Sequence, residues 1–265
     1  LTSFGHGAFF GIGAYAAALS QKHWFEGQLV LPLLFAVAFS AVLATIIGAL
    51  ILLRRGVYFS LLTLAFSALT YAIAFRWTSF TGGENGLGNV VRPAIGMVRL
   101  DEAVPYLIAV SAIGWLVLFF NWRLLRSPFG HVMAAIRENE QRAQFQGYDT
   151  QRYKWVIFIL SATVTGLAGA LLAFHHRFAS ADPTSVAFSG EMLAIVVIGG
   201  MHSLLGPVIG AFFYILFREF LSIWTPNWLL YFGLLFVGFI IFSPNGLVGV
   251  WARIAQRWNP LPETD

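Results

Sequence analysis

Histidine and glutamate side chains within the apolar stretches are the first candidates for chemistry, because imidazole and carboxylate groups bind metals and transfer protons. His175 and His176 are adjacent, so they do not share one helix face, and no carboxylate lies at a useful helical offset. A position at a membrane interface is therefore favoured over metal binding. His6 stands between Gly5 and Gly7 and could face a cavity, although a satisfied packing histidine is the better prediction.

Glu191 begins a short apolar stretch, and an acidic residue within a membrane usually marks a transport pathway or an ion pair. Its position at the edge of the stretch favours a solvated or helix-capping role instead. The motifs H-E-x-x-H, G-x-S-x-G, Walker A and a strand-linked G-x-G-x-x-G are missing, and the chain has no cysteine. The sequence therefore predicts no catalytic residue, no metal site and no bound cofactor.

The elements that position these residues must be membrane helices. Of the 265 residues, 58% are hydrophobic and 11% are charged, whereas a typical soluble domain has about 25% charged residues. The chain cannot supply the polar surface of a soluble protein of this size. Its net charge of +4 comes from short basic clusters between apolar runs, so we expect a lipid bilayer and no nucleic acid as its partner.

The apolar segments predict an all-α fold, a polytopic membrane helix bundle that forms one transmembrane domain over residues 1–265. Most segments are near the ~20 residues needed to cross the hydrocarbon layer. One is too short, which predicts a broken helix or a hairpin near residues 191–205. About eight segments are expected, at Phe4–Leu19, Leu29–Leu53, Val57–Phe75, Ala103–Trp122, Trp155–Phe174, Met192–Met201, Leu204–Leu221 and Trp228–Phe242. Glycines in "GHGAFFGIGAYAAA" and "SATVTGLAGALLA" predict close helix packing, with the lining of a substrate path as the alternative.

The basic residues predict the orientation, because cytoplasmic loops carry an excess of Lys and Arg. If the segments alternate, ten basic residues fall on one side and six on the other. The segment at about residues 123–154 then forms a cytoplasmic loop, and the segment at about residues 76–102 forms an extracytoplasmic loop. The cytoplasmic set is Arg54, Arg55, Arg123, Arg126, Arg137, Arg142, Arg152, Lys154, Arg253 and Arg257; the other is Lys22, Arg76, Arg92, Arg99, Arg177 and Arg218.

The charged stretch "SPFGHVMAAIRENEQRAQFQGYDTQRYK" within the cytoplasmic loop predicts an amphipathic helix. Phe129, Val132, Met133 and Ile136 recur at the spacing of one helix face, the charges from Arg137 to Arg142 follow on the same predicted helix, and Gly147 is a stop signal. A solvated connector is one interpretation. A helix that docks on a partner is the other, and it gains support because the chain has no nucleotide site and almost no ionisable residues in its apolar runs.

The sequence resembles the LivM-type permeases of bacterial ABC importers for branched-chain amino acids over nearly its whole length. The motifs that carry the resemblance are "SFGHGAFFGIGAYAAA", "RGVYFSLLTLAFSALTY", "TGGENGL", the charged stretch, "SATVTGLAGALLA", "IGGMHSLLGPVIGAF" and "PNGLVG". The start resembles a point after the family's first helix or helices, so an N-terminal segment is expected to be missing. His202 and Ser203 stand where a glycine and a small polar residue are expected, which puts the turn geometry there in doubt.

The resemblance implies a single permease domain in the bacterial inner membrane that is not an enzyme and binds no cofactor. It implies a LivH-type second permease, two LivG/LivF-type ATPase subunits that hold ATP and magnesium, and a periplasmic amino-acid-binding protein. Contact with the ATPases is implied for Ala135, Ile136, Arg137, Glu138, Asn139, Glu140, Ala143 and Gly147.

The glycine-rich stretch "TGGENGLG" is expected to shape an extracytoplasmic gate or a contact with the binding protein, with a flexible connector as the alternative. The residues that we assign to it are Thr81, Gly82, Gly83, Glu84, Asn85 and Gly86. The substrate class that the resemblance implies is leucine, isoleucine and valine; urea or a short amide is the alternative. An ion-coupled secondary transporter, a membrane enzyme and a structural scaffold are competing hypotheses from other classes.

Overall fold

The computed structural model describes residues 3–54, 56–91, 94–95, 98–100, 102–243 and 246–249. The chain divides into two compact units, Leu1–Ser189 (unit 1) and Gly190–Asp265 (unit 2). The long helices of unit 1 are α1 (His6–His23), α2 (Val30–Ile51), α3 (Val57–Arg76), α5 (Ala103–Leu125) and α8 (Thr150–His176). Its short elements are α4 (Thr78–Thr81), η1 (Gly83–Asn85), β1 (Ala94–Ile95), β2 (Val98–Arg99), α6 (Pro128–Glu138), α7 (Glu140–Phe145) and η2 (Asp182–Thr184).

The helical class is confirmed, with one small exception: β1 and β2 form an antiparallel pair in which Ala94 lies opposite Arg99. Among the described residues, five helices are long and apolar enough to cross a membrane: α2, α3, α5, α8 and α10 (Gly206–Trp224). The predicted count of about eight segments is therefore not confirmed. The helices α9 (Val186–Gly199) and α11 (Trp228–Phe242) have 14 and 15 residues, which at ~1.5 Å per residue fall short of a ~30 Å hydrocarbon layer.

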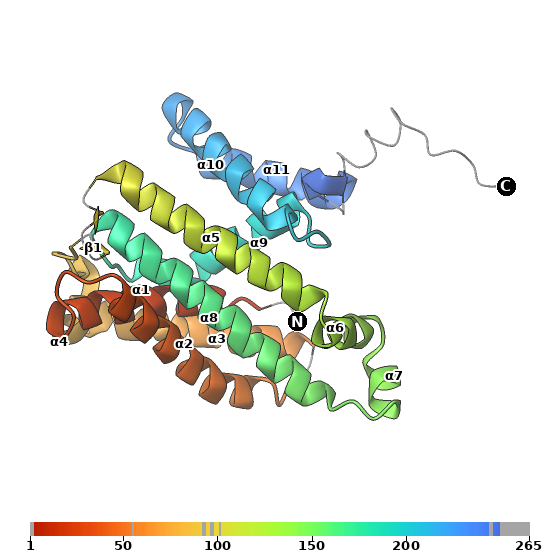
Figure 1. Cartoon of the computed structure of the whole chain (residues 1–265). Coiled ribbons are helices and arrows are strands. Elements are labelled where there is room, and N and C mark those ends of the chain that lie inside the picture. Colours follow the sequence, from red (N-terminus) through yellow and green to blue (C-terminus); the bar gives the residue numbers. More distant parts are fainter. Residues whose placement is uncertain are drawn as a thin grey trace. The chain divides into compact units, whose positions relative to one another are not determined.

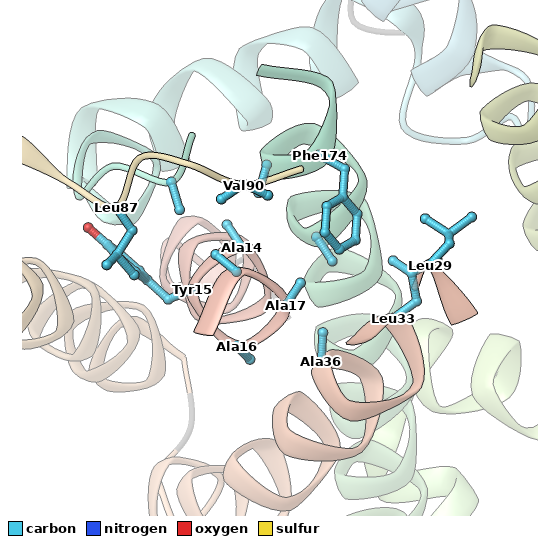
Figure 2. Close-up of a cluster of buried hydrophobic side chains, with 14 of the residues drawn as sticks. Ala14, Tyr15, Ala16, Ala17, Leu29, Leu33, Ala36, Leu87, Val90 and Phe174 are labelled. Atoms are coloured by element: carbon cyan, nitrogen blue, oxygen red, sulfur yellow. The ribbon is translucent and has the colours of Figure 1, made fainter. Parts of the chain in front are cut away.

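Close packing of α1 against α8 forms the centre of unit 1. A side chain at Gly13 would overlap the backbone of Gly166, and one at Gly169 would overlap the carbonyl group of Phe10. The alanines beside these glycines are buried with Phe174 in one cluster, which α2 completes with Leu33 (Figure 2). The prediction that these glycines allow close helix packing is confirmed.

The ends of these helices define two ends of unit 1. Figure 1 shows α6 and α7 beside the end of α5 and the start of α8, and α4 and β1 at the opposite end. The first end carries Arg54, Arg123, Arg126, Arg137, Arg142, Arg152 and Lys154, and the opposite end carries Lys22, Arg76, Arg99 and Arg177. The predicted separation of basic residues holds for this unit; Arg55, Arg92, Arg253 and Arg257 lie outside the described residues.

Unit 2 contains most of α9 together with α10 and α11. The predicted interruption lies at residues 200–205, where a turn joins α9 to α10, and Gly199 packs directly on the backbone of Gly206. Gly200 adopts the positive φ of this turn (118°), so neither His202 nor Ser203 needs a left-handed conformation. The doubt about the turn geometry is thereby removed.

Glu191 lies inside α9 rather than at its start, because the helix begins five residues earlier than the hydrophobic run indicates. Its Oε2 accepts a hydrogen bond of 3.0 Å from the hydroxyl of Tyr214 in α10. The predicted capping role is wrong, since Val186–Gly190 forms the first turn of the helix before Glu191.

Candidate functional site

Three polar residues divide the charged stretch into separate helices. The Ser127 hydroxyl accepts a hydrogen bond from the Gly130 amide (3.3 Å) and begins α6, with a proline in the first turn. The Asn139 side chain accepts one from the Arg142 amide (3.0 Å) and begins α7, and the Asp149 carboxylate begins α8 in the same way.

The prediction of one continuous helix from Phe129 to Gly147 is therefore wrong. Asn139 has an extended backbone (φ −154°, ψ 102°) that ends α6 and starts α7. A short amide side chain can satisfy the free amides of a new helix, which favours this break. The predicted stop is placed correctly, since Gly147 (φ +89°) follows the end of α7.

The apolar face of α6 turns toward the rest of unit 1, as its periodicity predicts. Phe129 stacks on Tyr153 of α8, with 5.2 Å between ring centroids, and Ile136 is 6% exposed. Ala143 of α7 is also buried. Ile136 and Ala143 therefore anchor the two short helices.

Charged and polar contacts attach α7 to the first turns of α8. Lys154 Nζ lies 2.5 Å from Glu140 Oε2, and the two side chains are 13% and 26% exposed. The Thr150 hydroxyl donates to Glu140 Oε1 (3.3 Å) and accepts from the Gln144 amide (2.9 Å). A movement of α7 would therefore be transmitted to α8.

The remaining predicted coupling residues differ in exposure. Arg137, Glu138 and Asn139 are exposed where α6 meets α7, and Gly147 is exposed beyond them. Ala135 is half-buried. The structure thus brings the eight residues onto one segment but places them on two faces, one packed inward and one open.

The glycine-rich turn at the opposite end of unit 1 has a defined backbone. Gly82, Gly83 and Gly86 all have positive φ values (77°, 61° and 64°), a conformation that other residues rarely adopt. The hydroxyl of Thr81 donates to the carbonyl groups of Ala74 (2.6 Å) and Trp77 (2.7 Å). The turn is thereby fixed to the end of α3.

Leu87, which follows the glycine-rich turn, joins this turn to the segment after α8. Leu87 and Ala179 exchange two backbone hydrogen bonds, of 2.8 and 3.0 Å. The glycine-rich stretch is therefore anchored on both sides rather than a connector without contacts. Glu84 and Asn85 are exposed at its tip.

Gln21 was not predicted to have a role, although it organises the same end of unit 1. Its buried side chain donates to the carbonyl of Val91 (3.0 Å) and accepts from the amide of Val91 (3.1 Å). The sequence signal for this role was a glutamine at the end of an otherwise apolar helix, because a buried amide needs hydrogen-bond partners.

The histidines have packing partners in unit 1. His6 Nε2 lies 2.7 Å from the Ser161 hydroxyl, which fits the predicted packing role. The ring of His175 stacks on Tyr106 at 5.9 Å between centroids. Within the described ranges, no group of three or more His, Cys, Asp or Glu residues could hold a metal ion.

Helices of membrane-spanning length, an amphipathic loop at one end and an anchored turn at the other define a multi-pass helical membrane protein. The family described as "Branched-chain amino acid transport system / permease component" matches residues 1–244. The chain belongs to this family.

Two relatives are the high-affinity branched-chain amino acid transport system permease proteins LivM of Salmonella typhimurium and Escherichia coli. Each is 30% identical over 269 residues, which cover 92% of this chain and 63% of the relative. A probable LivM of Methanocaldococcus jannaschii is 26% identical over 82% of this chain and 68% of its own length. The chain thus spans less than two thirds of the first two relatives.

A further relative has a different substrate in its name. The autoinducer 2 import system permease protein LsrC of Escherichia coli is 33% identical over 123 residues, or 42% of this chain and 35% of the relative. No solved structure is significantly similar to the chain.

Proposed function

We propose that this chain is the membrane-spanning permease subunit of an ATP-driven, binding-protein-dependent importer of leucine, isoleucine and valine in the bacterial inner membrane. The observation that carries the proposal is the match to the permease family over residues 1–244, together with 30% identity to LivM proteins over 92% of the chain. The LsrC match supports the same kind of machine but covers less than half of the chain.

ATPase coupling is assigned to the exposed junction of α6 and α7. Arg137, Glu138 and Asn139 are available to a partner, whereas Ile136 and Ala143 hold the helices in place. A push on the junction would pass through the Glu140–Lys154 ion pair into α8, which packs along α1. Two LivG/LivF-type ATPases with ATP and magnesium would supply that push, and rigid-body movement of helix groups would open the path.

The extracytoplasmic role belongs to the tip of the glycine-rich turn. Glu84 and Asn85 are exposed on a turn with a fixed backbone, which suits contact with a periplasmic amino-acid-binding protein. The substrate path would run at the interface with a LivH-type second permease, within one permease domain that includes both units.

The proposal is tested by uptake in proteoliposomes that contain the full-length protein, the second permease and the ATPase subunits. With loaded binding protein outside and ATP inside, we expect accumulation of labelled leucine, isoleucine or valine. Accumulation of urea or a short amide alone would reassign the substrate. Accumulation without ATPase subunits would favour an ion-coupled secondary transporter and exclude the proposed mechanism.

A further inference from the structure

A polar pocket of about 560 Å³ lies in unit 1 between the α2–α3 turn, α6, α7 and the start of α8. Its polar lining consists of Arg54, Ser60, Arg137, Glu140, Gln151 and Lys154. Three helices of membrane-spanning length begin or end at this pocket. The pocket therefore lies where the hydrocarbon layer meets the headgroup region.

The charges around this pocket favour an anion. Among the described residues of the lining, Arg54, Arg137 and Lys154 contribute three positive charges and Glu140 is the one carboxylate. Lys154 pairs with Glu140, whereas Arg54 and Arg137 form no ion pair within the part of the chain that the structure describes. Guanidinium groups bind phosphate oxygens through paired N–H donors, so phosphate is the group that this lining fits best.

An apolar groove of about 700 Å³ continues from the same arginine along α3. Its lining consists of Arg54, Tyr58, Leu61, Leu62 and Ala65. Tyr58, Leu61 or Leu62, and Ala65 recur every three or four residues, so they share one face of α3, and Arg54 lies in the turn before it. Tyr58 is 71% exposed and Leu61 is 55% exposed, and this face is the surface of a spanning helix. At ~1.5 Å per residue the helical part of the groove, from Tyr58 to Ala65, runs for about 10 Å, a length that suits part of an acyl chain.

We propose that the polar pocket and the apolar groove together bind one anionic glycerophospholipid. The phosphate lies between Arg54 and Arg137, and an acyl chain lies along Tyr58, Leu61 and Ala65. A soluble phosphate would occupy only the pocket. The pocket and the groove share Arg54, and a phospholipid has the same arrangement, with a polar headgroup followed by apolar acyl chains. The bound lipid fixes α6 to the turn between α2 and α3.

The proposal concerns a lipid site and does not depend on the transported substrate or on the ATPases. It is tested on the full-length protein alone, in mild detergent, by native mass spectrometry with added phosphatidylglycerol or phosphatidylcholine. We expect selective retention of phosphatidylglycerol. The double variant Arg54→Ala/Arg137→Ala is expected to lose affinity for it by about tenfold or more, because surface cations attract anionic lipid. Arg123→Ala removes an exposed cation at the same end that lines neither hollow, and it should retain the lipid.

A second pair of variants separates lipid from free phosphate. Ala65→Phe fills the groove and should weaken phosphatidylglycerol binding, while Ala68→Phe changes an exposed alanine of the same helix outside the groove and should not. An excess of inorganic phosphate should not displace the lipid. The proposal is overturned if the double-arginine variant binds phosphatidylglycerol as the unaltered protein does. It is also overturned if Ala65→Phe has no effect while phosphate competes, since the pocket would then be a site for a soluble anion.

Discussion

Lys154 Nζ lies 2.5 Å from Glu140 Oε2, and this ion pair attaches the short helix α7 to the long helix α8. Both side chains are mostly buried, so the pair is less screened by water than an exposed one. The same α8 packs along α1 through glycines at Gly13 and Gly166. A continuous set of contacts therefore runs from the exposed α6–α7 junction to the centre of unit 1.

Removing the cation of this pair should uncouple the loop. Lys154→Met breaks this largely buried ion pair at a cost of about 1 to 3 kcal/mol, and we expect ATP-driven uptake to fall several-fold at equal membrane abundance. Arg152→Met is the matched control, because it breaks a pair with Asp149 in which the side chains are 84% and 51% exposed. Its uptake should change less than about twofold. Equal losses in both variants would contradict a specific role for Lys154.

The close approach of α1 and α8 predicts a strong effect of side-chain size. Gly166→Leu forces atoms into the Ser40 side chain and against the α1 backbone at the carbonyl of Phe9, so we expect a loss of at least about 1 to 3 kcal/mol in stability. Gly114→Leu in α5 is the control, since nothing lies within 4 Å of a side chain added there. Thermal unfolding in detergent should show a lower midpoint for the first variant only.

These two regions show which features of the structure the sequence could predict. Hydrophobic periodicity predicted the helices and the inward face of α6, because burial of an apolar stripe follows directly from residue spacing. It could not predict the break at Asn139, which depends on one local hydrogen bond to the Arg142 amide. It also misplaced the start of α9, since Ser189, Gly190 and Glu191 separate Val186–Phe188 from the apolar run that follows.

Contacts between segments that are far apart in the chain could not be predicted from the sequence. The Gln21–Val91 hydrogen bonds and the Leu87–Ala179 bridge join residues far apart in the chain, and no local pattern specifies such partners. The separation of the coupling residues into buried and exposed faces likewise required the packing of α6 and α7 on α8.

The buried amide of Gln21 should hold the segment around Val91 in place. Gln21→Leu keeps the apolar volume but leaves both backbone groups of Val91 without these partners, at a cost of about 1 to 3 kcal/mol. We expect faster limited proteolysis after Gly86, with little change at the α6–α7 junction. An unchanged digestion pattern would show that other contacts hold this segment.

The glycine-rich turn should tolerate substitution at one glycine but not at another. Gly86 has a positive φ (64°), and an added Cβ would lie 2.6 Å from the carbonyl oxygen of Ala179. Gly88 has no neighbour within 4 Å. We therefore expect Gly86→Ala to reduce uptake stimulated by the binding protein severalfold, while Gly88→Ala keeps it within about twofold. Similar uptake in the two variants would contradict a role for the turn geometry.

Uptake by the reconstituted importer tests the central claim most directly. Proteoliposomes with the full-length protein, the second permease, the ATPase subunits and the loaded binding protein are assayed for labelled leucine with and without internal ATP. The account predicts ATP-dependent accumulation of leucine that is lost when the exposed residues Arg137 and Glu138 are both replaced by alanine. Leucine accumulation that needs neither ATP nor the ATPase subunits, or accumulation of urea and not leucine, would contradict it.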